Sequence, residues 1–446
     1  MPSSETTPTS PTLTAADEVV DICRELIRFD TSNYGDDSGP GERAAAEYTA
    51  TLLSDVGIEP EVFESAPGRT SLVARIEGAD RTRPALVVHG HLDVVPARAE
   101  DWTVDPFAGH VDGDLLWGRG AVDMKDMDAM VLSVVRQMAR EGRKPARDVV
   151  LAMFADEEAG GAYGARWAVD HRPDLFEGAS EAISEVGGFS VQVGDRRAYM
   201  LQTAEKGLAW LRLVAEGRAG HGSQVTPDNA VTHVAEAVAR IGRHAWPLDL
   251  TPTVRALLEG VADLTGLPFD PEDETGIDAL VAALGPASRF VGATLRHTSN
   301  PTQLTAGYKA NVVPGRAEAA VDTRFLPGRE DEFWATFGEL AGPHVRVEKI
   351  HHDVALEAPT TGALVDAMTD ALVAEDPQAV VLPYTLSGGT DNKSLSRLGI
   401  TGYGFAPLRL PADLDFAGMF HGVDERVSID ALKFGTRVLD RLLATC

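Results

Sequence analysis

An apolar run that ends in three acidic residues is the feature that most limits how this chain can fold. Residues 149–154 are continuously apolar and too few for a helix, so they predict a buried strand of a parallel sheet. Asp156, Glu157 and Glu158 follow at its carboxyl end. Like charges this close are unfavourable unless water, a cation or a proton separates them, and ligands collect at such strand ends. One glutamate could hold a metal ion while the other moves protons; a solvated acidic turn is the alternative.

Three further strand-like segments also end in side chains that can bind metals or move protons. They lead to His91 with Asp93, to Asp123 and to Glu185. Because an open α/β sheet gathers ligand sites along its carboxyl edge, these side chains are expected to meet. Taken singly, each has an ordinary alternative. The histidine could be a hydrogen-bonded structural residue, Asp123 a helix cap and Glu185 a surface carboxylate.

The residue types in these segments favour a catalytic metal site. Imidazole and carboxylate without thiolate are the ligands of a catalytic zinc or cobalt site rather than of a structural zinc site. The only cysteines are Cys23 and Cys446, which provide neither a disulfide framework nor a thiolate site. The spacing of His91 and Asp93 suits a pair in which the carboxylate accepts from the ring nitrogen that does not bind metal.

The order of predicted strands and helices changes twice along the chain, which predicts two domains. Its 446 residues exceed one core of usual size. Residues 14–202 and 354–446 alternate between strand and helix signals, as in an α/β fold with a mostly parallel sheet, whereas 203–353 contain β-α-β units of a smaller, inserted α+β domain. Within that domain an acidic, proline-containing insertion at about 247–295 has no clear pattern. Residues 1–13 are rich in Ser, Thr and Pro and predict a disordered tail.

The charge of the chain bears on its partners. It has 40 basic and 68 acidic residues, and its formal net charge is -28. Such a surface repels nucleic-acid phosphates and anionic membranes, so we expect no nucleic acid and no membrane as partner. The sequence has no signal-peptide pattern and no apolar run long enough to cross a bilayer, so we expect a cytoplasmic protein.

Together, these motifs resemble the dinuclear zinc amidohydrolases that include aminoacylase, acetylornithine deacetylase, succinyl-diaminopimelate desuccinylase and carboxypeptidase G. The resemblance rests on Gly-His-Leu-Asp-Val-Val-Pro at His91, Gly-Arg-Gly-x-x-Asp-Met-Lys at Asp123, the Asp-Glu-Glu segment, Glu185, and His421-Gly-x-Asp-Glu. It spans nearly the whole chain. It implies a zinc-peptidase catalytic domain with an inserted ferredoxin-like domain that serves as lid and dimerisation surface.

The resemblance also implies two Zn²⁺ ions, for which Co²⁺ can substitute, and five residues that bind them. Asp123 would bridge the ions, His91 and Glu185 would complete one site, and Glu158 and His421 the other. Glu157 would be the general base for hydrolysis by metal-activated water, and Asp93 would support His91. Two divalent ions would nearly balance the ligand carboxylates and a hydroxide. A cis peptide bond after Asp123 is a further implication.

Two residues of the inserted domain match family positions that act on the reacting carbonyl. His221, in Gly-Arg-Ala-Gly-His-Gly-Ser, resembles the histidine that reaches the partner subunit's site and donates to the oxyanion, which requires at least a homodimer. The usual Ala-His-Ser is replaced here by glycine on both sides, which implies a more flexible loop. Asn311 resembles the residue that helps to hold the carbonyl. A histidine hydrogen-bonded within its own loop is the alternative for His221.

The same resemblance implies which residues bind the carboxylate of the substrate. Arg324 would pair with the carboxylate, a task that suits the fork-shaped guanidinium. The backbone N–H groups of Gly388 and Gly389 could bind the same carboxylate. An ion pair with Asp322 is the alternative for Arg324, and a tight turn is the alternative for the glycines.

We therefore predict an N-acyl-L-amino acid amidohydrolase. Residues 390–393 and 402–408 resemble aminoacylases more than desuccinylases, and the long lid insertion resembles carboxypeptidase S and fatty N-acyl amino acid hydrolases. A dipeptidase or carboxypeptidase that cuts beside a free carboxylate is the alternative within the fold. A non-catalytic binding module is the alternative from another class, and the presence of Glu157 and all five ligand residues argues against it.

Overall fold

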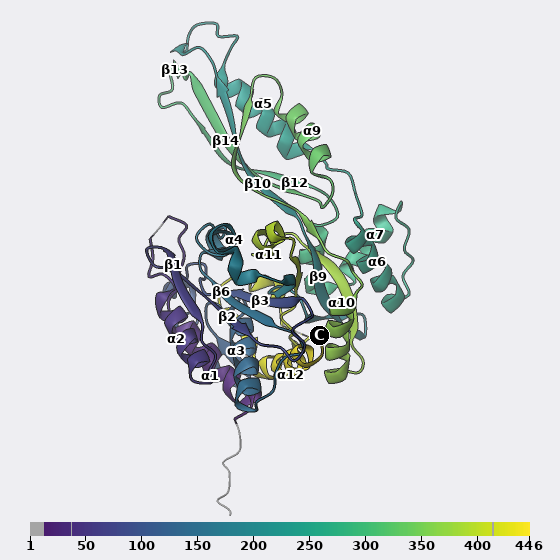
Figure 1. Cartoon of the computed structure of the whole chain (residues 1–446). Helices are drawn as coiled ribbons and strands as arrows, with labels where there is room; N and C mark the ends of the chain where they lie inside the picture. Colours follow the sequence, from purple (N-terminus) through teal and green to yellow (C-terminus); the bar gives the residue numbers. More distant parts are fainter. Residues whose placement is uncertain (1–12, 37, 413) are drawn as a thin grey trace, which may run out of the picture. The chain divides into compact units, whose positions relative to one another are not determined.

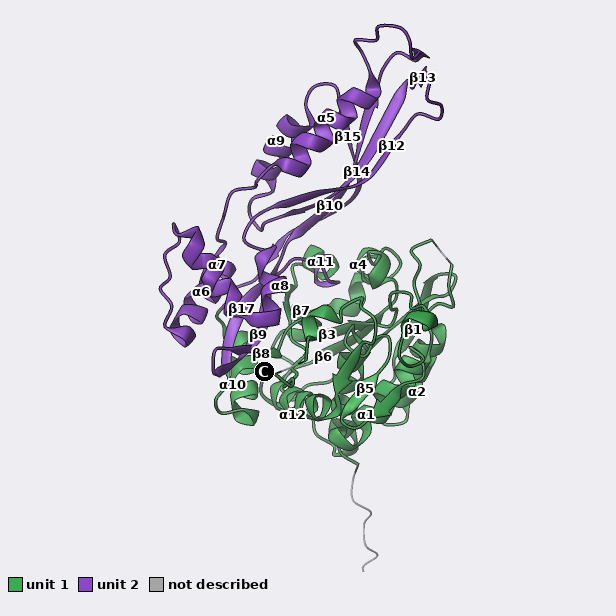
Figure 2. Cartoon of the chain, turned by 180° about the vertical axis from the view of Figure 1, so that it is seen from behind, with its two compact units in different colours: residues 1–190, 361–379, 394–446 green, residues 191–360, 380–393 purple. Residues whose placement is uncertain are grey.

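The structure is a computed structural model that describes residues 13–36, 38–412 and 414–446. It divides into two compact units (Figure 2). Unit 1 comprises 1–190, 361–379 and 394–446, and unit 2 comprises 191–360 and 380–393. Apart from Leu13, the tail predicted to be disordered lies outside the described residues.

Unit 1 is built on strands whose neighbour order is β1-β2-β6-β3-β7-β18. Four of them, β1, β2, β6 and β3, are labelled in Figure 1. The bounds of all these strands are β1 Glu61–Ala66, β2 Arg69–Ile76, β6 Val149–Phe154, β3 Ala85–His91, β7 Ala179–Ser184 and β18 Thr401–Gly404. The last four run parallel, whereas β1 and β2 are antiparallel to their neighbours. The strand predicted at 149–154 is β6, and all its residues are buried. The mostly parallel α/β fold is thus confirmed.

Helices flank this sheet. They are α1 Ala15–Arg28, α2 Arg43–Ser54, α3 Lys125–Arg140, α4 Ala165–His171, α10 Ala363–Glu375 and α12 Ile429–Thr445. Helices α1, α3 and α12 pack against one another. Helix α1 begins where Thr14 and Asp17 form a capping box, and its Cys23 is a buried free thiol, as is Cys446. Across the described residues, no helix is both long and apolar enough to cross a membrane.

The inserted domain of unit 2 contains an antiparallel sheet with neighbour order β12-β14-β10-β15. Its elements follow in the order β10 Gly207–Glu216, α5 Ala230–Arg243, β12 Thr298–Ala306, β14 Arg316–Phe325, α9 Glu330–Ala341 and β15 Arg346–Asp353. This β-α-β-β-α-β order is the ferredoxin-like arrangement. Strand β14 buries alternate residues, including Ala317, Ala319 and Val321, in a core that it shares with α5 and α9.

The insertion at 247–295 is helical. It forms α6 Pro252–Thr265, α7 Glu274–Ala282 and α8 Ser288–Gly292, with η4 Gly285–Ala287 before the last. Thr251 caps α6, Pro252 occupies its first position, and Gly266 ends it with a positive φ of 72°. Helices α6 and α8 pack against β17 Val380–Leu386, which pairs in parallel with β9 Arg196–Glu205.

Candidate metal centre

The predicted site residues of unit 1 lie at the carboxyl ends of neighbouring strands. His91 ends β3, Glu185 follows β7, and Glu157 and Glu158 begin the short 3-10 helix η2 Glu157–Ala159 after β6. Two loops complete the group. Asp123 lies just before α3, and His421 lies in a turn before β19 Arg426–Ser428.

Asp123 lies between two imidazoles. Its Oδ1 is 3.2 Å from Nε2 of His91, and its Oδ2 is 3.3 Å from Nε2 of His421. Each imidazole has a second carboxylate beside it: Oε2 of Glu185 lies 3.6 Å from Nε2 of His91, and Oε2 of Glu158 lies 3.1 Å from Nε2 of His421. Two adjoining sets of nitrogen and oxygen atoms therefore share the Asp123 carboxylate.

Glu157 lies at the edge of these sets. Two groups of three residues could each hold a metal ion, because one ligand atom from every member lies within 4.8 Å of those of the other two. The first group is His91, Glu157 and Glu185, and the second is His91, Asp123 and Glu158. The first group includes Glu157, but Oε2 of Glu157 is 4.0 Å from Nε2 of His91. This exceeds the corresponding distances of 3.2 Å to Asp123 and 3.6 Å to Glu185. Distance thus favours Asp123 and Glu185 over Glu157 as companions of His91.

The electrostatics of the site favour added positive charge. Burial would lower the pKa of the His91 imidazole, yet the carboxylates of Glu185 and Asp123 raise it well above its usual range. Hydrogen bonds to Asp123 and Glu158 raise the pKa of His421 to about 10. Burial raises the pKa of Glu185 to about 8. The crowded carboxylates therefore favour added positive charge at this site, which either protons or a cation could supply.

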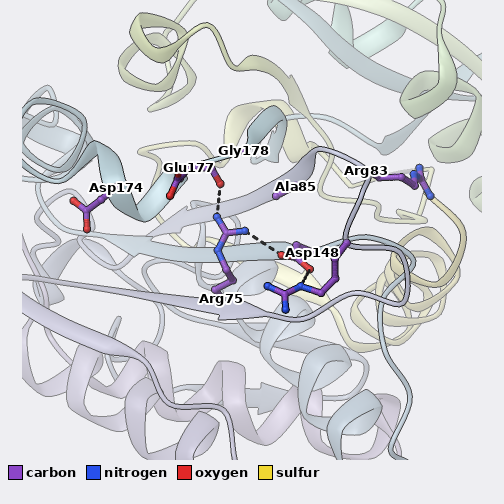
Figure 3. Close-up of a pocket in the computed structure, with 8 residues that line it drawn as sticks. Arg75, Arg83, Ala85, Asp148, Asp174, Glu177 and Gly178 are labelled. Atoms are coloured by element: carbon purple, nitrogen blue, oxygen red, sulfur yellow. Dashed lines mark hydrogen bonds and ion pairs between the residues drawn. The ribbon is translucent and has the colours of Figure 1, made fainter.

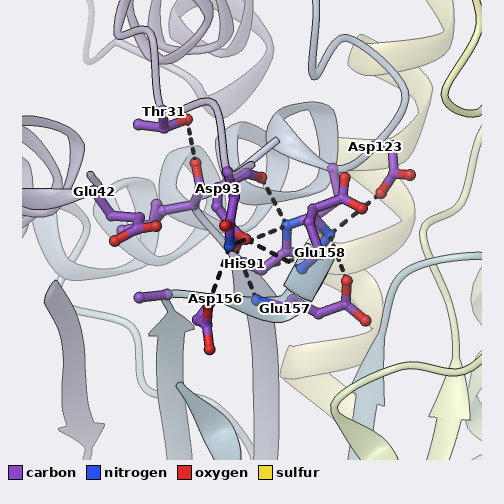
Figure 4. A network of polar contacts seen from close by, with 12 residues as sticks. Thr31, Glu42, His91, Asp93, Asp123, Asp156, Glu157 and Glu158 are labelled. Carbon is purple, nitrogen blue, oxygen red and sulfur yellow. Dashed lines mark hydrogen bonds and ion pairs between the residues drawn. The ribbon is translucent and has the colours of Figure 1, made fainter. Parts of the chain in front are cut away.

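Asp93 holds the turn that carries Glu157 and Glu158 (Figure 4). It is fully buried, and its Oδ1 and Oδ2 accept from the backbone N–H groups of Glu157 and Glu158, each at 3.1 Å. The expected bond between His91 and the Asp93 carboxylate is not present. Nδ1 of His91 lies 2.9 Å from the main-chain oxygen of Asp93 and 3.7 Å from its Oδ1. The carboxylate instead accepts from the N–H groups at the start of η2, so the main chain orients the ring.

Glu425 also belongs to the site, although the sequence predicts no role for it. Its fully buried carboxylate accepts from Nη1 of Arg119 at 2.7 Å and from the N–H groups of Gly120 at 3.2 Å, Val122 at 2.6 Å and Asp123 at 3.0 Å. Glu425 closes the motif that begins at His421, which is the only sequence signal for it. The peptide bond between Asp123 and Met124 is cis, which confirms the expectation from family resemblance.

The other predicted residues lie in unit 2. His221 belongs to β11 Gly220–His221, which pairs with β13 Val312–Val313, and the N–H of Gly222 donates to the oxygen of Asn311 at 2.9 Å. The segments of His221 and Asn311 are therefore adjacent. The His221 side chain is exposed, and its Nδ1 lies 2.8 Å from Oγ of Ser223, which is the local contact considered as its alternative.

Arg324 and the glycine loop also have local partners within unit 2. Nε and Nη2 of Arg324 donate to Asp322 at 2.8 and 3.1 Å, which is the ion pair considered as its alternative. Beside Gly388 and Gly389, the N–H and Oγ1 of Thr390 donate to the carboxylate of Glu205 at 3.1 and 2.7 Å. Because Glu205 is fully buried, it fixes one end of the glycine loop.

Unit 1 also has a hollow, which is lined mainly by arginines and acidic residues (Figure 3). It has a volume of about 400 Å³, and its lining includes Arg75, Arg81 and Arg83 as well as three acidic residues. Arg75 donates to Asp148 at 3.2 Å, and Nε of Arg81 lies 3.6 Å from the same carboxylate. The charges lining this hollow balance one another, and it contains none of the predicted site residues.

The chain matches one family model and is similar in sequence to known proteins. Residues 87–445 match the family described as Peptidase family M20/M25/M40. The chain is 28% identical over 391 residues to a Dictyostelium discoideum protein named Probable carboxypeptidase S-like 2, covering 81% of this chain and 72% of that protein. It is 25% identical over 437 residues to Aminoacylase-1 of Homo sapiens, covering 95% and 94%.

A solved structure has the same fold. The M20 family metallo-carboxypeptidase Sso-CP2 from Sulfolobus solfataricus superposes with a TM-score of 0.71 and 17% sequence identity, covering 96% of this chain and 99% of that one. At this identity the likeness concerns the fold alone.

Proposed function

This chain belongs to the peptidase family M20/M25/M40, and from that premise we propose that it hydrolyses the amide bond of N-acyl-L-amino acids. The products would be a carboxylic acid and a free amino acid. The observation that carries the proposal is the Asp123 carboxylate between the imidazoles of His91 and His421, with Glu157 beside them. The similarity to human Aminoacylase-1 over nearly the full length of both chains supports the choice of substrate class.

The residues around Asp123 fit a pair of divalent cations, Zn²⁺ or Co²⁺. They offer only imidazole nitrogen and carboxylate oxygen, and the raised pKa values of both imidazoles indicate a demand for positive charge. His91, Asp123 and Glu185 would hold one ion, and Asp123, Glu158 and His421 the other. When bound, such ions polarise a carbonyl group and lower the pKa of water.

Glu157 is proposed as the general base. Its side chain is 17% exposed, whereas those of the proposed ligands Glu158 and Glu185 are 5% and 8% exposed. It is therefore the glutamate that substrate and water reach most easily. Glu157 would take a proton from the attacking water and then deliver it to the leaving nitrogen. The bond from its backbone N–H to Asp93 fixes the start of the side chain.

Unit 2 would supply the substrate contacts. His221 would donate to the oxyanion across a homodimer, and Asn311, in the adjacent segment, would help to hold the carbonyl. Arg324 would bind the substrate carboxylate, with Asp322 holding the guanidinium in place, and Gly388 and Gly389 would offer backbone N–H groups. The homodimer and a cytoplasmic location remain predictions from the sequence.

The test is a comparison of substrates on the zinc- or cobalt-loaded protein. N-acetyl-Met and a long-chain N-acyl amino acid should be cleaved with a higher kcat/KM than the dipeptide Ala-Leu, and removal of metal with a chelator should abolish turnover. Clear preference for Ala-Leu would instead establish the dipeptidase or carboxypeptidase alternative, which the similarity to carboxypeptidase S-like 2 favours.

A further inference from the structure

A series of buried hydrogen bonds leads from Glu42 to the start of η2. Nη1 of Arg69 donates to Oε1 of Glu42 at 2.6 Å, and Nη2 of Arg69 donates to Oδ1 of Asn33 at 2.8 Å. Nδ2 of Asn33 in turn donates to Oδ2 of Asp93 at 2.9 Å. All four residues are at least nine-tenths buried. Asp93 then accepts from the first two N–H groups of η2, so the series ends at the backbone of Glu157 and Glu158.

Asn33 is the central member because its amide group is fully used. Its Nδ2 donates to Asp93 and also to Oδ1 of Asp156 at 3.1 Å, and its Oδ1 accepts from Arg69 and from the N–H of Gly35 at 3.0 Å. An amide has two N–H donors and one oxygen with two lone pairs, so both donors and both lone pairs have partners. A flipped amide would place its oxygen against two carboxylates, which fixes the orientation.

Arg69 brings positive charge to three buried carboxylates, those of Glu42, Asp93 and Asp156. It ion-pairs with Glu42 and with Asp156, whose Oδ1 lies 3.7 Å from Nε of Arg69. A buried carboxylate needs hydrogen bonds or a counter-charge. Arg69 and Asn33 therefore allow Asp93 to remain an acceptor for the N–H groups of η2.

The direction of two neighbouring side chains depends on that acceptor. Glu157 and Glu158 are consecutive, yet Oε2 of Glu157 lies 4.0 Å from His91, while Oε2 of Glu158 lies 3.1 Å from His421. A rotation of the first turn of η2 would move both carboxylates at once. Glu157 can lie near His91 while Glu158 lies beside His421 only if the first turn of η2 stays fixed.

We infer that Asn33 and Arg69 are positioning residues which, through Asp93, set the directions of the Glu157 and Glu158 side chains. This inference rests on the proposed function for its catalytic meaning. Neither residue touches the metal-binding atoms named above, so each acts only through its neighbours.

The Asn33 side chain can be removed without loss of its backbone contacts. The N–H of Asn33 donates to the oxygen of Val94 at 2.9 Å, and the N–H of Val94 donates to the oxygen of Thr31 at 3.2 Å. Ser32 and Val94 also form a parallel bridge. These main-chain contacts with Val94, which follows β3, remain in an Asn33→Ala variant, and the substitution removes only the four hydrogen bonds of the amide.

The experiment measures cobalt binding and kinetics in Asn33→Ala and Arg69→Lys. Arg69→Lys keeps the charge but cannot join Glu42 and Asn33 in the same fork. We expect Co²⁺ affinity and kcat to fall by about 10- to 100-fold, the usual effect of losing a residue that supports metal ligands, with KM changed by less than about twofold. The visible absorption bands of bound Co²⁺ should shift, which reports a change in ligand geometry.

Arg147→Lys is the matched control. Arg147 is equally buried, and its Nη1 donates to Oε2 of Glu181 at 2.6 Å, but it lies before the opposite end of β6. This variant should lower the melting temperature and leave the cobalt spectrum and kcat unchanged. A change in its cobalt spectrum as large as that of Asn33→Ala would overturn the inference, because general destabilisation would then explain both.

The readouts separate this inference from the proposed function. A folded Asn33→Ala protein with the wild-type cobalt spectrum and affinity would overturn the positioning role. If the wild-type protein bound cobalt but cleaved none of the three substrates, the proposed function would fail. The cobalt spectra of the variants would still decide the positioning role in that case.

Discussion

Glu425 accepts a hydrogen bond from the backbone N–H of Asp123 at 3.0 Å, although the two residues are 302 positions apart in the chain. The same carboxylate bonds to Arg119 and to two other N–H groups of the loop before α3. The position of Asp123, and with it the proposed bridge between two ions, therefore depends on a residue near the carboxyl terminus.

Replacing Glu425 should weaken both the fold and the site. In Glu425→Gln an amide NH₂ would face N–H donors, and Arg119 would lose its buried partner. Leaving such a charge unpaired costs about 3 to 5 kcal/mol, so urea denaturation should show a fall in the free energy of unfolding of that order. Glu61→Gln, which removes an exposed partner of Arg172, should cost less than about 1 kcal/mol. Equal losses in the two variants would contradict this role of Glu425.

Glu157→Gln should separate catalysis from metal binding. The amide cannot accept the proton of the attacking water, so kcat should fall by a factor of about 100 to 10,000. Metal content, measured by mass spectrometry after dialysis, should stay at the wild-type value. Glu158→Gln provides the comparison, because it alters a proposed ligand and should lower both metal content and kcat. Loss of metal in Glu157→Gln would mean that Glu157 is a ligand.

Thr390→Val should raise KM for a substrate that has a free carboxylate and leave KM unchanged for its ester. The variant keeps the shape of the side chain but loses the hydrogen bond from Oγ1 to Glu205, which holds the glycine loop. We expect KM for N-acetyl-Met to rise about tenfold, the equivalent of one hydrogen bond to a charged group. The methyl ester of the same substrate has no free carboxylate, so its KM should not change between wild type and variant. An equal rise for both substrates would count against the loop as carboxylate site.

His297 should make the stability of the protein depend on pH. Burial lowers the pKa of His297 to about 4, and its Nδ1 accepts from the N–H of Leu326 at 3.1 Å, which requires the neutral ring. In the unfolded chain the ordinary pKa is about 6.5. Between these values the unfolded state binds the extra proton, so stability should be lost as pH falls from about 6.5 to 4, by up to roughly 3 kcal/mol.

The measurement for His297 is the free energy of unfolding at pH 7, 6 and 5. In His297→Gln, where no proton can bind at this position, the decline over this range should be smaller than in the wild-type protein. Identical slopes would show that His297 is not the group responsible.

The sheet and the ends of its strands could be predicted because their signals are local. Residues 149–154 form a strand with the predicted bounds, since a short continuous apolar run that is buried on both faces has few alternatives. The three helices at 247–295 could not be predicted, because proline, glycine and acidic residues interrupt the apolar spacing there. Strand β9 could not be predicted either, since its last residues, including Gln202 and Glu205, are polar although buried.

The residues behind the site could not be predicted for a different reason. Asn33 and Arg69 contact Asp93, Asp156 and each other over separations of 36 to 123 positions, and no periodicity marks such contacts. The spacing predicts the carboxylate of Asp93 as the partner of His91, whereas the main-chain oxygen of Asp93 takes that place. Which oxygen the ring meets depends on where η2 begins, and spacing alone does not determine this.

The two imidazoles of the candidate centre differ in their access to solvent. The His421 side chain is 58% exposed, whereas that of His91 is 1% exposed. If each holds one ion, a chelator in solution meets the ion at His421 first. Stripping would then proceed in two kinetic phases, a fast and a slow one, and the half-emptied protein would retain the ion beside His91. The burial of the two side chains would thus determine the order in which the two ions are lost.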